Sequence, residues 1–259
     1  MGILKIENMT MQFGGLKAVD NFSLELGNEI VAVIGPNGAG KTTVFNVVTG
    51  VYQPTQGRVF FEGRDMAGRK PFEFANAGIA RTFQNIRLFG NATVLDNLLI
   101  AQTNSCGYGL CASLLRTRKF REQEQRMVDR AMELLEVFHL DQFAESLAKN
   151  LPYGPQRKLE IARALMTGPK VLLLDEPCAG MVESEMEELR ELVLFVKRKF
   201  AVSIVLIEHH MSFVMRLADR IKVLDFGVTI AEGSAEEVQN NPRVIEAYLG
   251  GGQKNDSEG

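Results

Sequence analysis

Residues 35–43, GPNGAGKTT, combine three glycines with a lysine and two threonines in the pattern G-x-x-x-x-G-K-[ST]. The stretch follows the apolar run EIVAVIG and precedes the helical pattern TTVFNVVTG, which ends at Gly50. Glycines let backbone N–H groups turn toward phosphates, Lys41 reaches β- and γ-phosphate oxygens, and Thr42 offers its hydroxyl to Mg²⁺. We therefore predict a loop that binds a nucleoside triphosphate. Its members are Gly35, Pro36, Asn37, Gly38, Ala39, Gly40, Lys41, Thr42 and Thr43.

Polar side chains also follow two other apolar runs. Asp175 and Glu176 end VLLLDEP, and His209 and His210 end LIEHHM. An acid at the end of a buried strand can hold Mg²⁺ through water, a second acid can deprotonate an attacking water, and a histidine can reach a γ-phosphate. Such groups also occur with purely structural roles, but a phosphate loop in the same chain favours the functional interpretation.

The apolar runs at 29–35, 170–176 and 202–209 are short and apolar enough for strands buried on both faces of a parallel sheet. Helical patterns follow the first two, so the fold class is α/β. Alternation in 3–26 and 57–63 predicts antiparallel strands, whereas 93–148 has only helical patterns. The charged run in this middle part indicates a solvated helix face.

The stretch LPYGPQRKLEIARAL, residues 151–165, predicts another helix start. Pro155 suits a first helical turn because its missing N–H would have no partner there. Gly154 then lies at a helix N-terminus, where free N–H groups and the helix dipole attract phosphate.

Composition limits the class of protein. The chain has 259 residues, 46% hydrophobic and 24% charged, and a net charge of −3, with a pI near 5.8. These values are typical of a globular protein with a sizeable core and give no basic surface for nucleic acid. Three cysteines (Cys106, Cys111 and Cys178) support neither a disulfide framework nor a zinc site and are consistent with a reducing compartment. No run is long enough to cross a membrane, and the first ten residues lack a secretory signal.

Taken in order, the motifs GPNGAGKT, RTFQNIRLF, LPYGPQRKLEIARAL, VLLLDEP and LIEHHM resemble the ATP-binding cassette of ABC transporters from residue 3 to 250. Three segments are similar in sequence to the cassettes of branched-chain amino acid importers: FGGLKAVDNFSLEL, GIARTFQNIRLFGNATVLDNLLIAQ and the C-terminal segment. The resemblance implies a P-loop NTPase core, with a RecA-like parallel sheet and an antiparallel β subdomain, plus an inserted helical subdomain. Residues 1–92 and 157–250 would form the core, 93–156 the helical subdomain, and 251–259 a flexible tail.

The resemblance also implies roles for single residues. Phe13 would stack on adenine, Glu176 would be the general base, and His209 the switch histidine. Gln84 would sense Mg²⁺ and the attacking water, and its loop would carry movement to the helical subdomain. Thr42, Gln84 and Asp175 would hold Mg²⁺, partly through water. His210 stands where relatives usually carry aspartate, so it receives no role.

In such a family the signature segment around Gly154 binds the ATP held by a second cassette, so ATP joins two cassettes head to tail. The helical subdomain and the glutamine loop would form a groove for a short helix of the membrane partner. The partners would be two membrane-spanning permease subunits and, indirectly, a substrate-binding protein. The chain is then expected in the cytoplasm, peripheral on the inner face of the cell membrane, with no nucleic-acid partner.

Two positions depart from the family pattern, on surfaces offered to the second cassette. Pro152 replaces a serine whose hydroxyl bonds the γ-phosphate, and Val182 replaces a polar residue facing the partner's phosphate loop. We expect a heterodimer with unequal ATP sites, although the Gly154 helix end could also suffice alone.

Three other functions remain to be weighed. A soluble ABC ATPase of DNA repair or translation would carry a long coiled coil or tandem cassettes, and this acidic chain has neither. A regulatory module that never hydrolyses ATP is disfavoured by Glu176. A cassette for urea, amides, other amino acids or lipid export stays open, because no residue here touches the transported molecule.

Overall fold

The structure is a computed structural model that describes residues 2–102 and 118–249. Its contacts divide the chain into two compact units, one formed by Met1–Arg81 with Lys170–Gly259 and the other by Thr82–Pro169. Cys106, Cys111 and the expected tail at 251–259 lie outside the described residues. Among the described helices, none combines the length and the apolar character that crossing a membrane requires.

The first unit contains a six-stranded sheet in the order β10-β9-β3-β8-β7-β6. Its strands are β3 (Ile30–Ile34), β6 (Ile79–Arg81), β7 (Val171–Asp175), β8 (Ser203–Ile207), β9 (Arg220–Asp225) and β10 (Val228–Gly233). Neighbouring strands from β9 to β6 pair in parallel, and β10 pairs antiparallel with β9. Every residue of β3, β7 and β8 is buried, which confirms the three strands predicted from apolar runs. The other three strands were not predicted.

A second, four-stranded sheet in the same unit is antiparallel, in the order β2-β1-β4-β5. It consists of β1 (Leu4–Phe13), β2 (Leu16–Leu26), β4 (Gln56–Phe61) and β5 (Arg64–Asp65). Buried and exposed residues alternate along much of β2, as one solvated face requires. The antiparallel prediction for this part of the chain is therefore confirmed.

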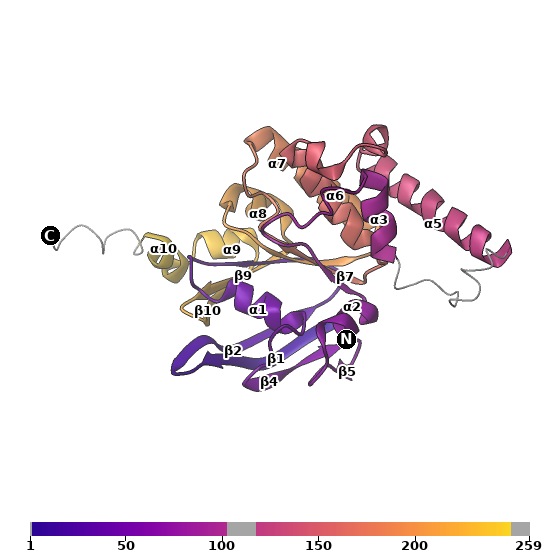
Figure 1. Cartoon of the computed structure of the whole chain (residues 1–259). Coiled ribbons are helices and arrows are strands. Elements are labelled where there is room, and N and C mark those ends of the chain that lie inside the picture. The colour runs from indigo at the N-terminus through magenta and orange to yellow at the C-terminus, as the bar shows by residue number, and fades with distance from the viewer. Residues whose placement is uncertain (1, 103–117, 250–259) are drawn as a thin grey trace. The chain divides into compact units, whose positions relative to one another are not determined.

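Helices complete the first unit: α1 (Lys41–Val48), α2 (Pro71–Ala77), α7 (Glu183–Phe200), α8 (Met211–Leu217), α9 (Ala235–Gln239) and α10 (Pro242–Leu249). Helix α1 lies between the two sheets (Figure 1). Its Phe45 belongs to one apolar core together with Phe22 of β2, Phe61 of β4 and Val205 of β8. This core holds the loop before α1 close to the ends of the parallel strands.

The second unit holds α3 (Val94–Gln102), α5 (Arg118–Val137), the short 3-10 helices η2 (Asp141–Phe143) and η3 (Ala148–Asn150), and α6 (Tyr153–Met166). Among its described residues there is no strand, only an isolated bridge between Thr93 and Leu147. Helix α3 packs against α5 and α6. The buried Ala131 and Leu135 of α5 face this core, while most of its charged residues stay accessible. The expected subdomain boundary at 156/157 falls inside α6.

Candidate functional site

The candidate site of the first unit is built at the carboxyl edge of the parallel sheet. Val33 of β3 is in register with Ile207 of β8, which is in register with Asp175 of β7. Because the three strands run parallel, the segments that follow them leave the sheet at one edge. The phosphate loop, the pair of acids and the two histidines therefore meet there, as the sequence predicts.

Glycine is required at both ends of the phosphate loop. Gly40 has φ 99°, and a Cβ atom on it would lie 2.4 Å from the carbonyl oxygen of Ala18. A Cβ atom on Gly35 would lie 2.0 Å from the carbonyl oxygen of Leu224. The loop ends at α1, whose N-terminus has no side-chain cap, so its first N–H groups are available to an anion. The loop is thus a backbone cradle of the kind that phosphates need.

Lys41 is buried within this cradle. Its Nζ donates hydrogen bonds to the carbonyl oxygens of Gly35, at 2.7 Å, and Pro36, at 2.8 Å. Burial lowers the pKa of this ammonium group, and the nearby carboxylates of Glu176 and Asp175 oppose that shift. The two carboxylates favour the charged form of the ammonium, and burial removes part of its hydration. Such a group is suited to binding a polyanion such as a phosphate chain.

Asp175 is buried at the end of β7 and paired with Arg81 of β6. The Nη2 atom of Arg81 donates to Asp175 Oδ2 over 2.7 Å, and Nη1 donates to Asn46 of α1 over 2.8 Å. The sequence did not point to Arg81, because its partner lies far along the chain. The pair holds the Asp175 carboxylate in a fixed orientation at the sheet edge.

Glu176 has a left-handed backbone conformation, with φ 46°. Its N–H donates to the carbonyl oxygen of Ile207 over 2.9 Å, which ties this residue to the end of β8. Glu176 Oε2 lies 3.8 Å from Nδ1 of His209, whose side chain is half exposed. The carboxylate expected to act as the base and the expected switch histidine are therefore neighbours.

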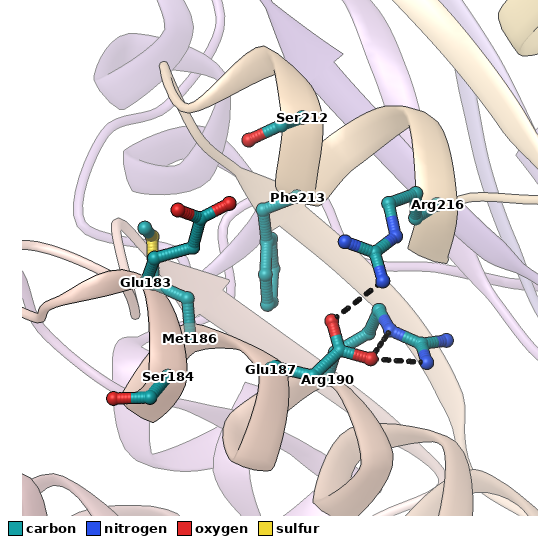
Figure 2. Close-up of a pocket in the computed structure, with 8 residues that line it drawn as sticks. All are labelled: Glu183, Ser184, Met186, Glu187, Arg190, Ser212, Phe213 and Arg216. Atoms are coloured by element: carbon teal, nitrogen blue, oxygen red, sulfur yellow. Dashed lines mark hydrogen bonds and ion pairs between the residues drawn. The ribbon is translucent and has the colours of Figure 1, made fainter.

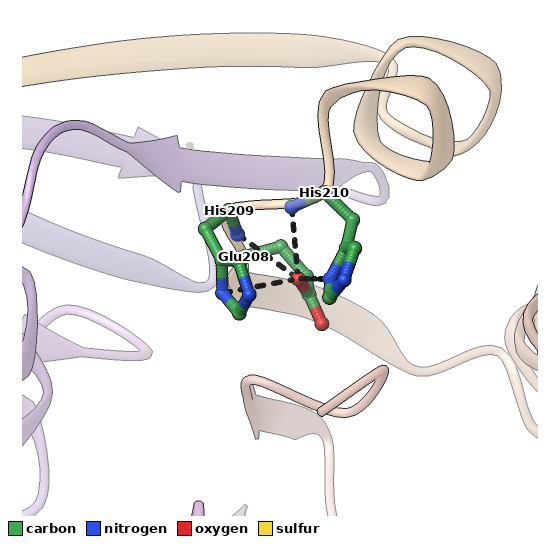
Figure 3. A group of neighbouring side chains, drawn as sticks. All are labelled: Glu208, His209 and His210. Atoms are coloured by element: carbon green, nitrogen blue, oxygen red, sulfur yellow. Dashed lines mark hydrogen bonds and ion pairs between the residues drawn. The ribbon is translucent and has the colours of Figure 1, made fainter. Parts of the chain in front are cut away.

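Glu208, which precedes His209, is a site residue that the sequence analysis missed (Figure 3). Its carboxylate is fully buried and accepts hydrogen bonds from the N–H groups of Cys178, at 2.7 Å, His209, at 2.9 Å, and His210, at 3.2 Å. The ring of His210, in the tautomer with its proton on Nδ1, donates over 3.0 Å to Glu208 Oε2, the oxygen that also accepts from the N–H groups of His209 and His210. One carboxylate thus joins the turn after β7 to the turn after β8.

The side chains of Glu208, His209 and His210 each offer one potential metal ligand, all within 4.8 Å of one another. However, Glu208 Oε2 already accepts from three donors, and its other oxygen accepts from Cys178. These contacts fit a carboxylate that positions two turns better than one that coordinates a metal ion.

Three further predicted site residues are Phe13, Gln84 and Gly154. Phe13 ends β1, is 43% exposed, and its ring meets that of Tyr52 edge to face with 5.2 Å between centroids. Gln84 and Gly154 belong to the second unit, Gln84 exposed and Gly154 buried. Helix α6 begins at Tyr153, so Gly154 lies in its first turn, which confirms the predicted helix start.

Comparison with known proteins agrees with this geometry. A family model described as "ABC transporter" matches residues 19–179. A "High-affinity branched-chain amino acid transport ATP-binding protein LivG" of Salmonella typhimurium is 48% identical over 249 residues, covering 96% of this chain and 98% of the relative. The chain belongs to the ABC transporter family. Within the family it is one of the LivG-type ATP-binding proteins, and it binds and hydrolyses ATP.

Two further comparisons narrow the group. A second model, "Branched-chain amino acid ATP-binding cassette transporter", matches residues 228–254 of the cassette. The protein BraF of Pseudomonas aeruginosa, with the same description as LivG, is 44% identical over 96% of this chain and 98% of its own. A solved ATP-binding cassette of an ABC transporter in its ADP conformation superposes with a TM-score of 0.84 and 36% identity, covering 96% of this chain and 99% of that chain. The resemblance noted in the sequence and the predicted fold class are confirmed.

The cassette also has a pocket between α7 and α8, of about 310 Å³ (Figure 2). Glu187 dominates its polar side, accepting from Arg190, at 2.7 Å, and contacting Arg216, at 2.9 Å. With Glu183, the lining has two carboxylates and two guanidinium groups, so the pocket carries no net charge to attract an anion or a cation. It shares no residue with the phosphate loop or the strand-end acids.

Proposed function

We propose that this cassette powers the import of branched-chain amino acids. The observation that carries the proposal is the 48% identity with LivG across nearly the whole of both chains. The match of residues 228–254 to the branched-chain amino acid group supports it independently of the nucleotide motifs. Urea, amides, other amino acids and lipids remain the alternative cargoes.

The test is to isolate the chain as a complex with its membrane subunits. ATP hydrolysis by this complex is then measured in the presence of a substrate-binding protein. We expect leucine, isoleucine or valine to raise the rate, and urea or glutamine to leave it unchanged. Stimulation by one of the other cargoes alone would overturn the assignment.

Within each turnover, Glu176 would act as the general base. It takes a proton from water, whose oxygen bonds to the γ-phosphorus while the bond between that phosphorus and the β–γ bridging oxygen breaks, leaving ADP. The proximity of His209 Nδ1, 3.8 Å from Glu176 Oε2, supports a role for this histidine at the γ-phosphate. Lys41 would hold the β- and γ-oxygens.

Thr42, Gln84 and Asp175 fit a Mg²⁺ site by chemistry, because hydroxyl, amide and carboxylate oxygens are the ligands this ion prefers. Asp175 is held at the strand end by Arg81, and Thr42 is exposed at the start of α1. When bound, Mg²⁺ would neutralise charge that develops on the phosphate oxygens.

Phe13 would stack on the adenine, and Gly154 would bind the ATP of a second cassette. Two cassettes and two permease subunits would form the transporter at the inner face of the cell membrane, served by a substrate-binding protein. The exposure of Phe13, Pro152 and Tyr153 supports contacts with groups outside this chain.

A second proposal concerns the pairing of cassettes. Pro152 is exposed at the start of α6 and Val182 is 62% exposed at the start of α7, yet neither can hydrogen-bond through its side chain. We infer a heterodimer in which the site using this chain's phosphate loop hydrolyses well and the site using Pro152 is slower. Removing the phosphate-loop lysine of each cassette in turn tests this, and equal residual hydrolysis would contradict it.

A further inference from the structure

The second unit buries an ion pair on α6. Arg157 and Glu160 are each 1% exposed, and Nη1 of Arg157 donates to Oε2 of Glu160 over 2.9 Å. Taking two charges out of water is costly unless nearly every donor and acceptor finds a partner. The other hydrogen-bond partners of Arg157 and Glu160 therefore indicate which segment the ion pair fixes in place.

Those partners are backbone groups of the glutamine loop, residues 83–87. Arg157 donates from Nη1 to the carbonyl oxygen of Phe83 over 2.7 Å and from Nη2 to that of Gln84. Glu160 Oε1 accepts from the N–H groups of Phe83, at 3.2 Å, and Arg87, at 3.4 Å. The two side chains thus bind four backbone groups of a loop that lies more than 70 residues earlier in the chain.

The same guanidinium also contacts the signature segment. Nη2 of Arg157 donates to the hydroxyl of Tyr153 over 3.0 Å, and the guanidinium carbon lies 5.6 Å from the centre of that ring. Tyr153, Arg157 and Glu160 are spaced four and three residues apart, so they share one face of α6. Tyr153 directly precedes Gly154.

We propose that Arg157 and Glu160 form a clamp that fixes the main chain of Gln84 to the signature segment, so that the two move together. Arg157 is then a positioning residue: it acts on hydrolysis through Gln84 and on the second cassette's ATP through Tyr153 and Gly154. A planar guanidinium suits this task because it donates to several acceptors in fixed directions. The inference rests on the proposed roles of Gln84 and Gly154.

The first test compares Arg157→Lys with Arg163→Lys in the full chain. Lysine keeps the charge beside Glu160, which avoids leaving a buried carboxylate unpaired, but it loses the fork. Arg163 is the matched control, because it lies on the same helix, its guanidinium lies over the Phe89 ring, and lysine keeps the positive charge that it presents to Glu160. We expect Arg157→Lys to lower kcat at least about tenfold with KM for ATP within about twofold, since the lost bonds involve a charged donor. Arg163→Lys should leave both near the wild-type values.

A double-mutant cycle with Gln84→Ala separates positioning from general damage to the fold. If Arg157 acts through Gln84, Arg157→Lys should lower kcat little further once Gln84 is alanine. Additive losses, or an Arg157→Lys enzyme with normal kcat, would overturn the clamp. If Gln84→Ala itself leaves kcat unchanged, the proposed role of Gln84 fails instead, and hydrogen exchange decides on the clamp.

Hydrogen exchange is measured on the amides of Phe83 and Arg87, which the clamp protects through Glu160. Arg157→Lys should speed their exchange while leaving that of α1 unchanged, and unchanged exchange at both amides would contradict the clamp. Should Arg157→Lys fold poorly, Tyr153→Phe removes only the hydroxyl that bonds Arg157, from a residue that is 43% exposed, and keeps the ion pair. We expect a fall in kcat of about two- to fivefold that disappears in the Gln84→Ala background, and additive losses would again overturn the proposal.

Discussion

The backbone conformation of Glu176 sets the position of its carboxylate beside His209. A non-glycine residue at φ 46° costs about 1–3 kcal/mol, and such a conformation persists only where the surroundings enforce it. Here the N–H of Glu176 is held by the carbonyl oxygen of Ile207, 2.9 Å away. At this strained turn the chain leaves the direction of β7, and the Glu176 carboxylate lies 3.8 Å from His209 Nδ1.

Replacing Glu176 with glutamine should nearly abolish hydrolysis. The amide keeps the shape of the side chain but cannot take a proton, and loss of a general base costs about 10²–10⁴ in rate. ATP binding should persist because the phosphate loop is untouched. Phosphate release and ATP affinity, measured on the same preparation, check both parts, and retained turnover would remove Glu176 from this role.

Removing the ammonium of Lys41 should act on binding itself. Lys41→Ala deletes a buried charge that would bond phosphate oxygens, and one charge-assisted hydrogen bond is worth about 1.5–3 kcal/mol. ATP affinity should fall about 10- to 100-fold in a calorimetric titration. Lys149→Ala, which removes an exposed ammonium bonded to Asn91, serves as the control. An unchanged ATP affinity for Lys41→Ala would refute the cradle assignment.

Candidate site residues could be predicted only where they belong to a recognisable local sequence motif. Lys41, Asp175 and Glu176 stand in short motifs, so their placement at one sheet edge follows from three parallel strands. Arg81 and Glu208 carry no such pattern. Arg81 bonds to Asp175, 94 residues later in the chain, and Glu208 accepts the N–H of Cys178, 30 residues earlier. Only the tertiary structure brings these partners together.

At the scale of elements, Glu208 couples two strands at their functional ends. It is buried, it follows β8, and it accepts the N–H of Cys178 in the turn after β7. The turn carrying Glu176 and the turn carrying His209 therefore cannot shift independently without leaving a buried donor unpaired, which costs about 1–3 kcal/mol.

Glu208→Gln should consequently lower kcat more than it changes KM. The amide replaces one acceptor oxygen by a donor, which opposes backbone N–H groups and displaces one of the two turns. We expect kcat to fall about tenfold or more while KM for ATP changes less than about twofold. Glu62→Gln, at an exposed ion pair with Lys170, is the control. Equal losses in kcat and ATP affinity would show instead that the substitution damages the whole site.

Strands β9 and β6 of the parallel sheet were harder to predict, for a physical reason. In β9, Lys222 is 4% exposed, with its ammonium paired to Glu232 of β10 and lying 5.4 Å from the centre of the Phe22 ring. A buried charge inside RIKVLD breaks the apolar pattern that identifies β3, β7 and β8. Strand β6 has only three residues, too few for any periodicity.

At the scale of the whole molecule, we expect Pro152 to determine whether two copies of this cassette can join through ATP. In a Glu176→Gln background, which preserves bound ATP, we expect the chain to stay monomeric on sizing chromatography with ATP and Mg²⁺. Adding Pro152→Ser restores a hydroxyl for the γ-phosphate and should produce a dimer, since one such bond is worth about 1.5–3 kcal/mol. Equal dimerisation of both proteins would mean that the Gly154 helix end suffices and would remove the basis for unequal sites.

The measurement that tests the central claim most directly is uptake of radiolabelled leucine into proteoliposomes. They would contain this cassette with its membrane subunits, with ATP and Mg²⁺ on the cassette side and the substrate-binding protein on the other. We predict uptake that isoleucine and valine suppress by competition, that urea does not affect, and that Glu176→Gln abolishes. Leucine uptake that continues at the same rate with Glu176→Gln would contradict the claim that hydrolysis at this chain's own site drives the import of branched-chain amino acids.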